Sequence, residues 1–377
     1  MAPFVQRSHC SCSGLHIGTS LVLQYAFSPF VSRKLFFSQM ISSFRIPPKN
    51  QNVRAIEIAG GGLQARVLSH GAALQDLRLD GHPSPLILGF TDLRCYLDHS
   101  AHHGAIAGPV INRIAEGTAV IDGTIYRFDR NDHGRQTLHG GRAGFGTLNW
   151  QIVDAAPDSV TLSLHMSDGH MGFPGPVEAH CRYSLGRGPD GGASLSIDLR
   201  ATSPATTLLN MGHHSYFCLD DKADIRTHNL RIDADHYLPA DKTDLATGDI
   251  LPVMGTDFDF TRDRAISGSY DNNFCVAQAR RAPRLVARLT SPYSGVAMDV
   301  ITSEPGLQLY TGHKLGAPVN GLRGIEDGPY AGLCLEPQMW PNAPSHPDFP
   351  SILVRPGDTC HQISQFCFFN GQDTNTL

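Results

Sequence analysis

Two adjacent histidines, His213 and His214, are the first candidates for chemistry, because imidazole titrates near neutral pH and can donate, accept or bind. They lie in the segment 207–219, which begins as an apolar, strand-like run and becomes polar at the histidine pair. Successive side chains of a strand point to opposite faces, so at most one of the two can face a given cavity. The alternative is that one histidine is a hydrogen-bonded core residue and the other lies at the surface.

A single carboxylate, Glu336, follows the apolar run 331–335. We expect it to end that strand, where an ionised carboxylate is costly to bury unless it is paired or functional. A carboxylate and an imidazolium are in opposite protonation states near neutral pH, which suits concerted acid and base catalysis. A salt bridge at the end of the strand is the alternative interpretation of Glu336.

Five further polar residues interrupt apolar or turn-rich segments, and their side chains can form directional hydrogen bonds to a small polar ligand. They are Asn112, Arg113, His139, Asp271 and Gln308. Structural roles are also open: Arg113 can be an ion-pair partner, His139 before two glycines a loop residue, and Asp271 beside two asparagines a turn former. The residues alone therefore do not decide between binding and structure.

The elements that must position these side chains are short strands. From Val53 onward apolar and polar residues alternate in short segments, with turn signals about every ten residues. Asp122-Gly123, between two such segments, predicts a hairpin with a type I′ turn. No long segment has the helical apolar period. We therefore predict one large all-β domain over residues 51–377, a sandwich or a barrel.

Composition excludes several classes of function. The formal net charge of −5 does not suggest a nucleic-acid surface. The 9 cysteines are odd in number and scattered without a C-x-x-C pair, which argues against a disulfide framework or a zinc site and favours a reducing compartment such as the cytoplasm. No Walker A, H-E-x-x-H or G-x-S-x-G motif occurs, so we expect no nucleotide cofactor.

The first fifty residues differ from the rest, because they contain no Asp or Glu but carry Arg, Lys and many serines. The apolar stretch 21–30 is short and is interrupted by Gln24 and Pro29, so it is a poor membrane span. We expect residues 1–50 to lie outside the fold. They are either an organelle-targeting leader or an upstream extension, with Met40 as the true start.

Taken together, the polar clusters resemble the aldose 1-epimerase family, also called galactose mutarotases, from about Ile56 to Phe368. Each motif is weak alone, but seven of them occur in the order typical of the family. The matching segments are Asn112-Arg113-Ile114, Leu138–Gly141, Asp168–Gly175, His213–Leu219, Tyr270–Phe274, Glu304–Gly312, and Leu335–Gln338 followed by Pro341–Pro344 and Phe349–Ser351.

The resemblance implies a large antiparallel β-sandwich with a sugar cleft on its concave face. It implies interconversion of the α and β anomers of a free hexose such as galactose or glucose, without a metal or redox cofactor. By similarity, Glu336 is the general base at the C1 hydroxyl and His214 the general acid at the ring oxygen. The substrate-binding residues carried over by similarity are Asn112, Arg113, His139, Asp271 and Gln308.

Two departures from the family pattern affect expected specificity more than reaction type. Pro109 replaces the arginine usual after the glycine, and His213 replaces an asparagine. By strand alternation we expect His213 to point away from the cleft. Two alternatives stay open: an epimerase of a hexose 6-phosphate, for which only Arg113 and Arg142 are candidate phosphate ligands, and an inactive sugar-binding module. The expected partner is a small sugar, with the chain a monomer or weak homodimer and neither nucleic acid nor membrane involved.

Overall fold

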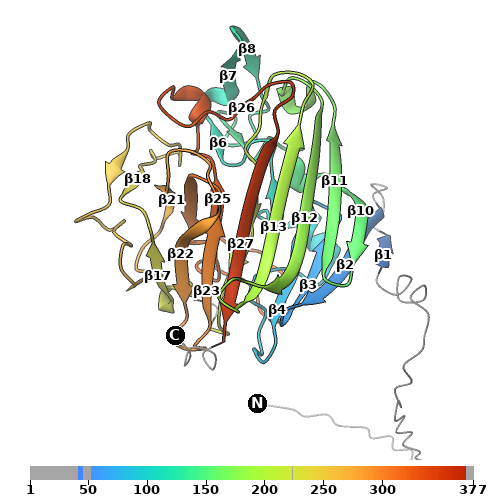
Figure 1. Cartoon of the computed structure of the whole chain (residues 1–377), viewed down its shortest axis with the longest axis vertical. Helices are drawn as coiled ribbons and strands as arrows, with labels where there is room; N and C mark the ends of the chain where they lie inside the picture. The colour runs from blue at the N-terminus through green and yellow to red at the C-terminus, as the bar shows by residue number, and fades with distance from the viewer. Residues whose placement is uncertain (1–40, 46–51, 223, 371–377) are drawn as a thin grey trace, which may run out of the picture. The chain divides into compact units, whose positions relative to one another are not determined.

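The computed structural model of the chain describes residues 41–45, 52–222 and 224–370 (Figure 1). The expectations for a targeting leader and for Met40 as the start fall outside the described residues. Residues 41–45, which we expected to lie outside the fold, instead pair as a strand with the segment 52–56. All ladders between the described strands are antiparallel, which confirms the predicted all-β class. None of the helices in these ranges is long and apolar enough to cross a membrane.

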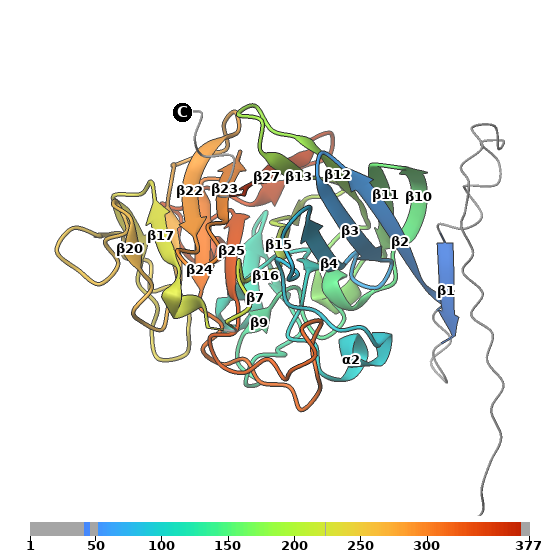
Figure 2. The same cartoon turned by 90° about the horizontal axis from the view of Figure 1, so that it is seen from below.

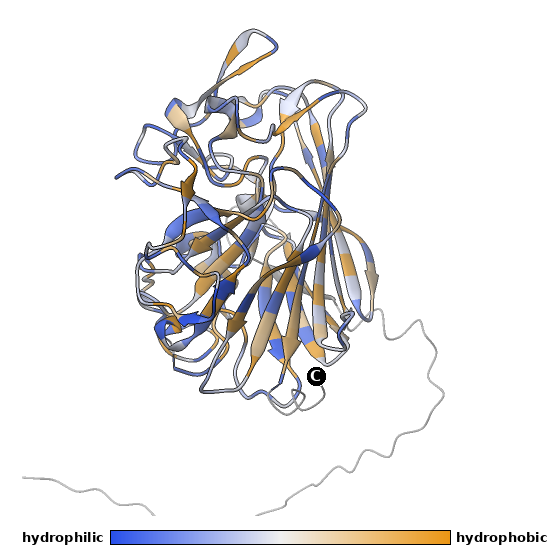
Figure 3. Ribbon diagram, turned by 60° about the vertical axis from the view of Figure 1, so that its left-hand side comes forward, coloured by the Kyte–Doolittle hydropathy of each residue, from blue (hydrophilic) through white to orange (hydrophobic). Residues whose placement is uncertain are grey.

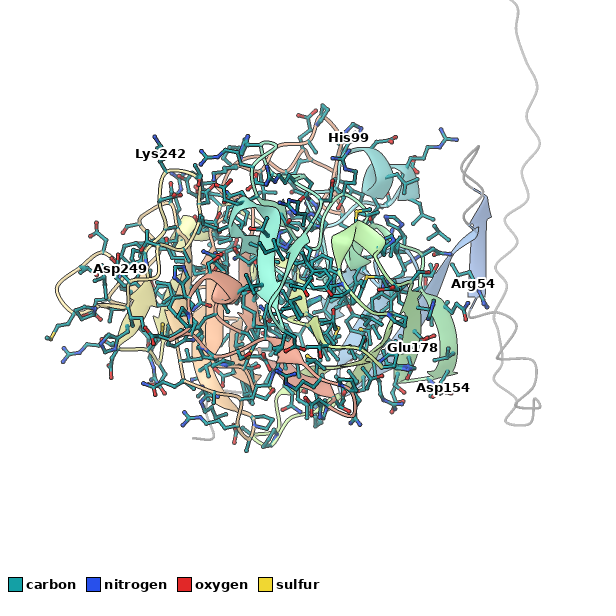
Figure 4. All side chains as sticks on the ribbon, turned by 90° about the horizontal axis from the view of Figure 1, so that it is seen from above. Arg54, His99, Asp154, Glu178, Lys242 and Asp249 are labelled. Atoms are coloured by element: carbon teal, nitrogen blue, oxygen red, sulfur yellow. The ribbon has the colours of Figure 1, made fainter. Side chains whose placement is uncertain are left out.

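The largest sheet has nine strands. In spatial order they are β10 (Gln151–Ala156), β11 (Ser159–Met166), β12 (Val177–Arg187), β13 (Ala193–Thr202), β27 (Cys360–Phe369), β23 (Ala297–Thr302), β22 (Arg284–Thr290), β17 (Asn229–Ile232) and β20 (Arg264–Ala265). Side chains alternate between buried and exposed along β12, as a sheet with one covered face requires. Figure 3 shows this alternation as changing colour along the strands. Asp154 and Glu178 are exposed, and Figure 4 places both at the margin of its view.

A six-stranded sheet and a four-stranded sheet form the remaining larger ladders. The six-stranded sheet runs β16 (Tyr216–Phe217), β25 (Leu333–Gln338), β24 (Gly306–Tyr310), β21 (Asp271–Cys275), β18 (His236–Leu238) and β19 (Leu251–Pro252). The four-stranded sheet runs β1 (Ile41–Arg45), β2 (Asn52–Gly60), β3 (Leu63–Leu68) and β4 (Leu74–Leu79).

Four short ladders and a few helical turns complete the described elements. The ladders are β14 (Thr207–Leu208) with β26 (Leu353–Val354), β15 (Gly212–His214) with β5 (Ala105–Ala107), β6 (Arg113–Ile114) with β9 (Thr137–Leu138), and β7 (Thr118–Ile121) with β8 (Thr124–Arg127). The helices are α2 (Leu93–Asp98) and the 3₁₀ turns η1 (Ala115–Gly117), η2 (Phe145–Thr147), η3 (His170–Gly172), η4 (Ile225–Thr227) and η5 (Ala343–Ser345).

The apolar core lies between the nine-stranded sheet and the two smaller ones (Figure 2). Phe217 of β16 packs on Phe366 of β27 with ring centroids 4.9 Å apart, which joins the six-stranded sheet to the large sheet. Tyr183 of β12 donates its hydroxyl to the carbonyl of Ala72, between β3 and β4, at 2.8 Å. The two smaller sheets therefore cover one face of the large sheet, and this packing confirms the predicted β-sandwich.

Candidate active site

One face of the six-stranded sheet carries the polar residues. Directly opposed residues of antiparallel strands project to the same side. Gln308 opposes Glu336 across β24 and β25, and Asp271 opposes Tyr310 across β21 and β24. Asp271, Gln308 and Glu336 therefore share one face, while Leu307 and Leu335 point to the other face, into the core. Glu336 lies inside β25 and not at its end, so that expectation was wrong: backbone pairing with β24 continues through Gln338.

His214, on β15, lies beside this face. Its Nε2 atom is 3.6 Å from Oε1 of Glu336, and both side chains are almost completely buried. Its Nδ1 atom is 3.5 Å from the sulfur of Cys334, which is on the same face of β25 as Glu336. The structure thus brings the expected imidazole and carboxylate together from positions far apart in the chain.

His213 points the other way, as strand alternation predicted. Its ring packs between the sheets against Tyr183 and Phe366, with centroids 6.1 and 5.9 Å away. Its Nε2 atom hydrogen-bonds to the hydroxyl of Ser215 at 3.0 Å. Burial lowers the pKa of His213 to about 3, so it is a neutral core histidine. Tyr216 is also buried, but it opposes Cys334 across β16 and β25 and packs against His214, with ring centroids 5.2 Å apart. Its hydroxyl donates to the carbonyl of Ala101 at 2.9 Å.

Arg113 lies between three carboxylates. Its Nε atom donates to Asp132 at 2.9 Å, Nη2 is 3.5 Å from Asp244, and Nη1 is 3.9 Å from Asp271. The ion-pair and binding interpretations of Arg113 are compatible, because Asp132 and Asp244 hold a guanidinium that reaches Asp271. Asp271 also accepts a hydrogen bond from the amide of Gln308 at 2.8 Å.

Asn112 and His139 are held together by two hydrogen bonds, one donated by the backbone amide of each residue. The amide of Asn112 donates to Nδ1 of His139 at 3.2 Å, and the amide of His139 donates to the carbonyl of Asn112. We expected Asn112 to interrupt a strand, but its φ of 63° is left-handed, and β6 begins after it. At Gly140, a Cβ atom would lie 2.1 Å from the carbonyl oxygen of Gly108, so only glycine fits beside His139. Gly108 precedes Pro109 through a cis peptide bond.

Burial moves the pKa values of Glu336, His214 and His139 toward their neutral forms. It raises the pKa of Glu336 well above the usual range, and the charge of Asp271 adds to that rise, while Arg113 opposes it. Burial lowers the pKa of His214 and His139 well below the ordinary value, and the neighbouring His102 lowers both further. Burial at this site therefore favours protonated Glu336 and neutral imidazoles.

A cavity of about 310 Å³ adjoins the cluster at Asp271. Carboxylates and aromatic rings line it, among them Asp241, Asp244, Tyr237 and His313. Two of the carboxylates come from the segment between β18 and β19, where Figure 4 labels Lys242 and Asp249 at the margin of its view. An opening of this kind beside buried hydrogen-bonding groups is typical of a small-molecule site.

Within the described part of the chain, two groups of side chains have the spacing of metal ligands. His214, Cys334 and Glu336 form one, but burial raises the pKa of the Cys334 thiol well above its ordinary value, which disfavours the thiolate that binds metals. Cys218, Asp220 and His228 form the other group. The candidate ligand atoms of this group already accept hydrogen bonds. Arg323 donates to the sulfur of Cys218, Ser291 donates to Asp220, and the amide of Leu219 donates to His228. We assign a metal to neither group.

Sequence reasoning did not single out two residues that contact His214. Cys334 lies two positions before Glu336, so strand alternation could have placed it on the same face. The ring of His102 packs at a tilt against that of His139, with centroids 4.6 Å apart, and its centroid lies 5.8 Å from that of His214. Its loop, 99–104, has no periodic pattern that would have indicated this position.

The fold and the site define an all-β protein in which a buried imidazole and a buried carboxylate lie 3.6 Å apart. Asp271, which shares the sheet face of Glu336, lines a polar cavity. The family model of aldose 1-epimerases matches residues 54–367. The chain belongs to the aldose 1-epimerase family, as the motifs suggested.

Relatives of this chain match it along nearly their whole length. It is 34% identical to the galactose mutarotase of Homo sapiens, over 86% of this chain and 96% of the human protein. It is 32% identical to the aldose 1-epimerase of Escherichia coli, over 86% of this chain and 97% of that protein. The solved structure of a GalM/aldose epimerase homologue from C. elegans matches with a TM-score of 0.78 at 30% identity, covering 84% of this chain and 98% of that one.

Proposed function

We propose that this protein is an isomerase, an aldose 1-epimerase that interconverts the α and β anomers of free hexoses such as galactose and glucose. The observation that carries the proposal is the 3.6 Å separation of His214 Nε2 and Glu336 Oε1. The anomeric hydroxyl oxygen and the ring oxygen of a hexose are bonded to the same carbon. An acid and a base that act on these two oxygens must therefore be neighbours, as His214 and Glu336 are.

In the proposed reaction Glu336 takes the proton of the C1 hydroxyl while His214 gives a proton to the ring oxygen. The bond between C1 and the ring oxygen breaks, and its electron pair goes to the ring oxygen as C1 becomes an aldehyde. Rotation about the C1–C2 bond presents the other face of the aldehyde. Ring closure then returns both protons with the roles reversed, so the enzyme ends as it began. Each positioned group contributes about 10²–10⁴-fold to the rate.

The catalytic pair works with one proton between its two members. A carboxylate with an imidazolium starts ring opening, and a carboxylic acid with a neutral imidazole remains once the ring is open. Both arrangements contain the same number of protons, so pH does not change their ratio. Because burial favours the neutral forms of both groups, it favours the carboxylic acid with the neutral imidazole, which is the protonation state of the pair when the ring is open.

The remaining polar groups suit the hydroxyls of a sugar. Arg113, Asp271 and Gln308 offer donors and acceptors on the same face as Glu336. Nδ1 of His139 accepts a hydrogen bond from the backbone amide of Asn112, so the neutral ring carries its proton on Nε2 and can donate there. The side-chain oxygen of Asn112 accepts a hydrogen bond from the amide of Arg113 at 2.8 Å. Asn112 therefore contributes to the site by holding His139 through its backbone amide.

Charge at the site favours a free sugar over a hexose 6-phosphate. Arg113 and Arg142 were the two candidate phosphate ligands, and both are paired: Arg113 with three carboxylates and Arg142 with Asp129 at 2.9 Å. The adjoining cavity is lined by Asp241, Asp244 and Asp271. A phosphate there would face like charges at a cost of several kcal/mol.

We place this activity in a single catalytic domain, residues 51–377, since every residue assigned to it lies between Asn112 and Glu336. The seven cysteines of the described part are free thiols, which suits a reducing compartment such as the cytoplasm.

Polarimetry of freshly dissolved α-D-galactose and α-D-glucose tests the proposal. We expect the enzyme to bring both sugars to equilibrium faster than buffer alone. We expect kcat/KM for glucose 6-phosphate to be lower than for glucose by about 100-fold or more, as the acidic lining predicts. Equal rates with and without enzyme would refute the epimerase, and a preference for glucose 6-phosphate would select the phosphate alternative.

Asp271→Asn is expected to change the pH profile in a definite direction. His214 and Glu336 are active as a pair when they hold one proton between them. Because the pKa of Glu336 is raised and that of His214 is lowered, this proton resides mainly on Glu336. The alkaline limb of the pH profile, where the proton is lost, therefore reports mainly the pKa of Glu336. Asp271 raises the pKa of Glu336, so its neutralisation moves the alkaline limb of kcat/KM to lower pH and raises KM. The exposed Asp249→Asn, labelled in Figure 4, is the control and should leave the profile unchanged. A limb that stays in place or moves upward contradicts the assignment.

A further inference from the structure

His102 adds a third imidazole to the two buried imidazoles of the site. Its ring centroid lies 4.6 Å from that of His139 and 5.8 Å from that of His214, and the centroids of His139 and His214 are 5.2 Å apart. The three rings come from three separate segments: the loop 99–104, the residue that follows β9, and β15. The proposed reaction assigns no role to His102.

The backbone fixes His102 beside the site. Ala105 of β5 pairs with His214 of β15, and the amide of Gly104 donates to the carbonyl of His214 at 3.0 Å. The amide of Ala105 also donates to the carbonyl of His102 at 3.0 Å, which closes a turn. In this turn His102 has a φ of 60°, a left-handed conformation that is uncommon outside glycine and often occurs at functional sites. The loop therefore holds the imidazole of His102 in one place.

The ring of His102 has no hydrogen-bond partner among the described residues, unlike its neighbours. His103 accepts the amide of Ala101 at Nδ1, at 3.2 Å, and His139 accepts the amide of Asn112 in the same way. Those two rings are buried, whereas the ring of His102 is partly exposed. Its nitrogens are thus available to a ligand that lies against the site.

We propose that His102 is a substrate-binding residue, whose ring forms a hydrogen bond with a hydroxyl group of the hexose bound beside His139 and His214. The inference rests on the proposed function, which makes a hexose the ligand of this site. Burial lowers the pKa of His102 to about 4, so near neutral pH the ring is neutral and offers one donor and one acceptor. A hydroxyl group also both donates and accepts, so it can pair with either ring nitrogen.

A packing role is the alternative, in which His102 only supports the ring of His139. Two substitutions separate the roles. His102→Phe keeps an aromatic ring against His139 but removes both hydrogen-bonding nitrogens. His102→Gln loses the ring but keeps a donor and an acceptor. Binding therefore predicts that phenylalanine is the more harmful replacement, and packing predicts that glutamine is.

Polarimetry with galactose tests these predictions. One hydrogen bond corresponds to about 3- to 10-fold in affinity, so we expect His102→Phe to raise KM by that factor. We expect kcat to stay within about 2-fold, as for a contact made equally in the ground and transition states. His102→Gln should raise KM less. The control is His99→Phe, at an exposed position of the same loop labelled in Figure 4, which should leave KM unchanged. A larger KM for His102→Gln than for His102→Phe, or an unchanged KM in His102→Phe, would overturn the proposal.

A binding measurement separates this inference from the proposed function. Galactose at anomeric equilibrium is not altered by an epimerase, so its Kd can be measured by calorimetric titration of the wild type and of His102→Phe. We expect the Kd to be about 3- to 10-fold higher in His102→Phe. Equal Kd values would refute the contact even if the enzyme is an active epimerase. The expected increase would support the contact even if polarimetry detects no turnover.

Monodeoxy derivatives of galactose, each lacking one hydroxyl group, test whether the contact is direct. The ratio of the Kd of His102→Phe to that of the wild type should fall to about 1 for the derivative that lacks the contacted hydroxyl. For the other derivatives the ratio should stay as it is for galactose. The same ratio for every derivative would exclude a hydrogen bond between His102 and a hydroxyl of the sugar.

Discussion

Glu336→Gln is expected to lower kcat for mutarotation about 10²–10⁴-fold, because glutamine keeps the shape of the side chain but cannot take a proton. The protein should remain folded. Glu336 is almost completely buried, and burial raises its pKa, so folding disfavours its charge, and a neutral amide removes that cost. We expect the free energy of unfolding at neutral pH to be unchanged or higher. Polarimetry and urea denaturation measure the two effects on the same sample.

Glu304→Gln is the matched control, since Glu304 is also completely buried but forms an ion pair with Arg280 at 2.7 Å. Breaking that pair should lower the free energy of unfolding by about 1–3 kcal/mol. The folded fraction should retain its kcat. If Glu304→Gln loses activity while Glu336→Gln keeps it, the catalytic assignment is wrong.

His214→Asn is expected to lower kcat by a similar factor of about 10²–10⁴, because an amide cannot give a proton to the ring oxygen. The asparagine still fills part of the space beside Glu336, so far-ultraviolet circular dichroism should match the wild type. The decrease should appear in kcat and kcat/KM together, as for a group that acts in the transition state. A variant with wild-type kcat would exclude His214 as the acid.

His213→Asn is the control in the next position of the chain. His213 packs against Tyr183 and Phe366 in the core and has no contact with Glu336. We expect an unchanged kcat within about 2-fold and a modest loss of stability, within the range of about 0.5–3 kcal/mol usual for point substitutions. Loss of activity in His213→Asn with retention in His214→Asn would reverse the assignment of the two imidazoles.

Local patterns were enough to predict much of the fold. The Asp122-Gly123 hairpin exists as β7 and β8, with φ of 47° and 80° at the two turn residues. Alternation of apolar and polar residues indicated many short strands, because one face of such a strand lies on the core. Alternation also separated His213 from His214, since opposite faces of one strand face different surroundings.

Contacts between distant segments could not be predicted from local patterns. Cys334 meets His214 across 120 positions of the chain, and Arg113 meets Asp244 across 131. The sequence identified Arg113 as a candidate but could not show that three carboxylates surround it. The left-handed turn at Asn112 was also missed, because asparagine adopts it at a cost too small to leave a strong signal.

The alternation of β24 and β25 links chemistry to folding. Gln308 and Glu336 face the site, while Leu307, Leu309 and Leu335 face the core. A slip of either strand by one residue would turn its polar residues into the core and its leucines into the cavity. Such a mispaired sheet would bury a carboxylate among apolar side chains at high cost. Gln308 and Glu336, to which we propose roles in the site, thus also favour the correct pairing of β24 and β25, because they make the misaligned pairing unstable.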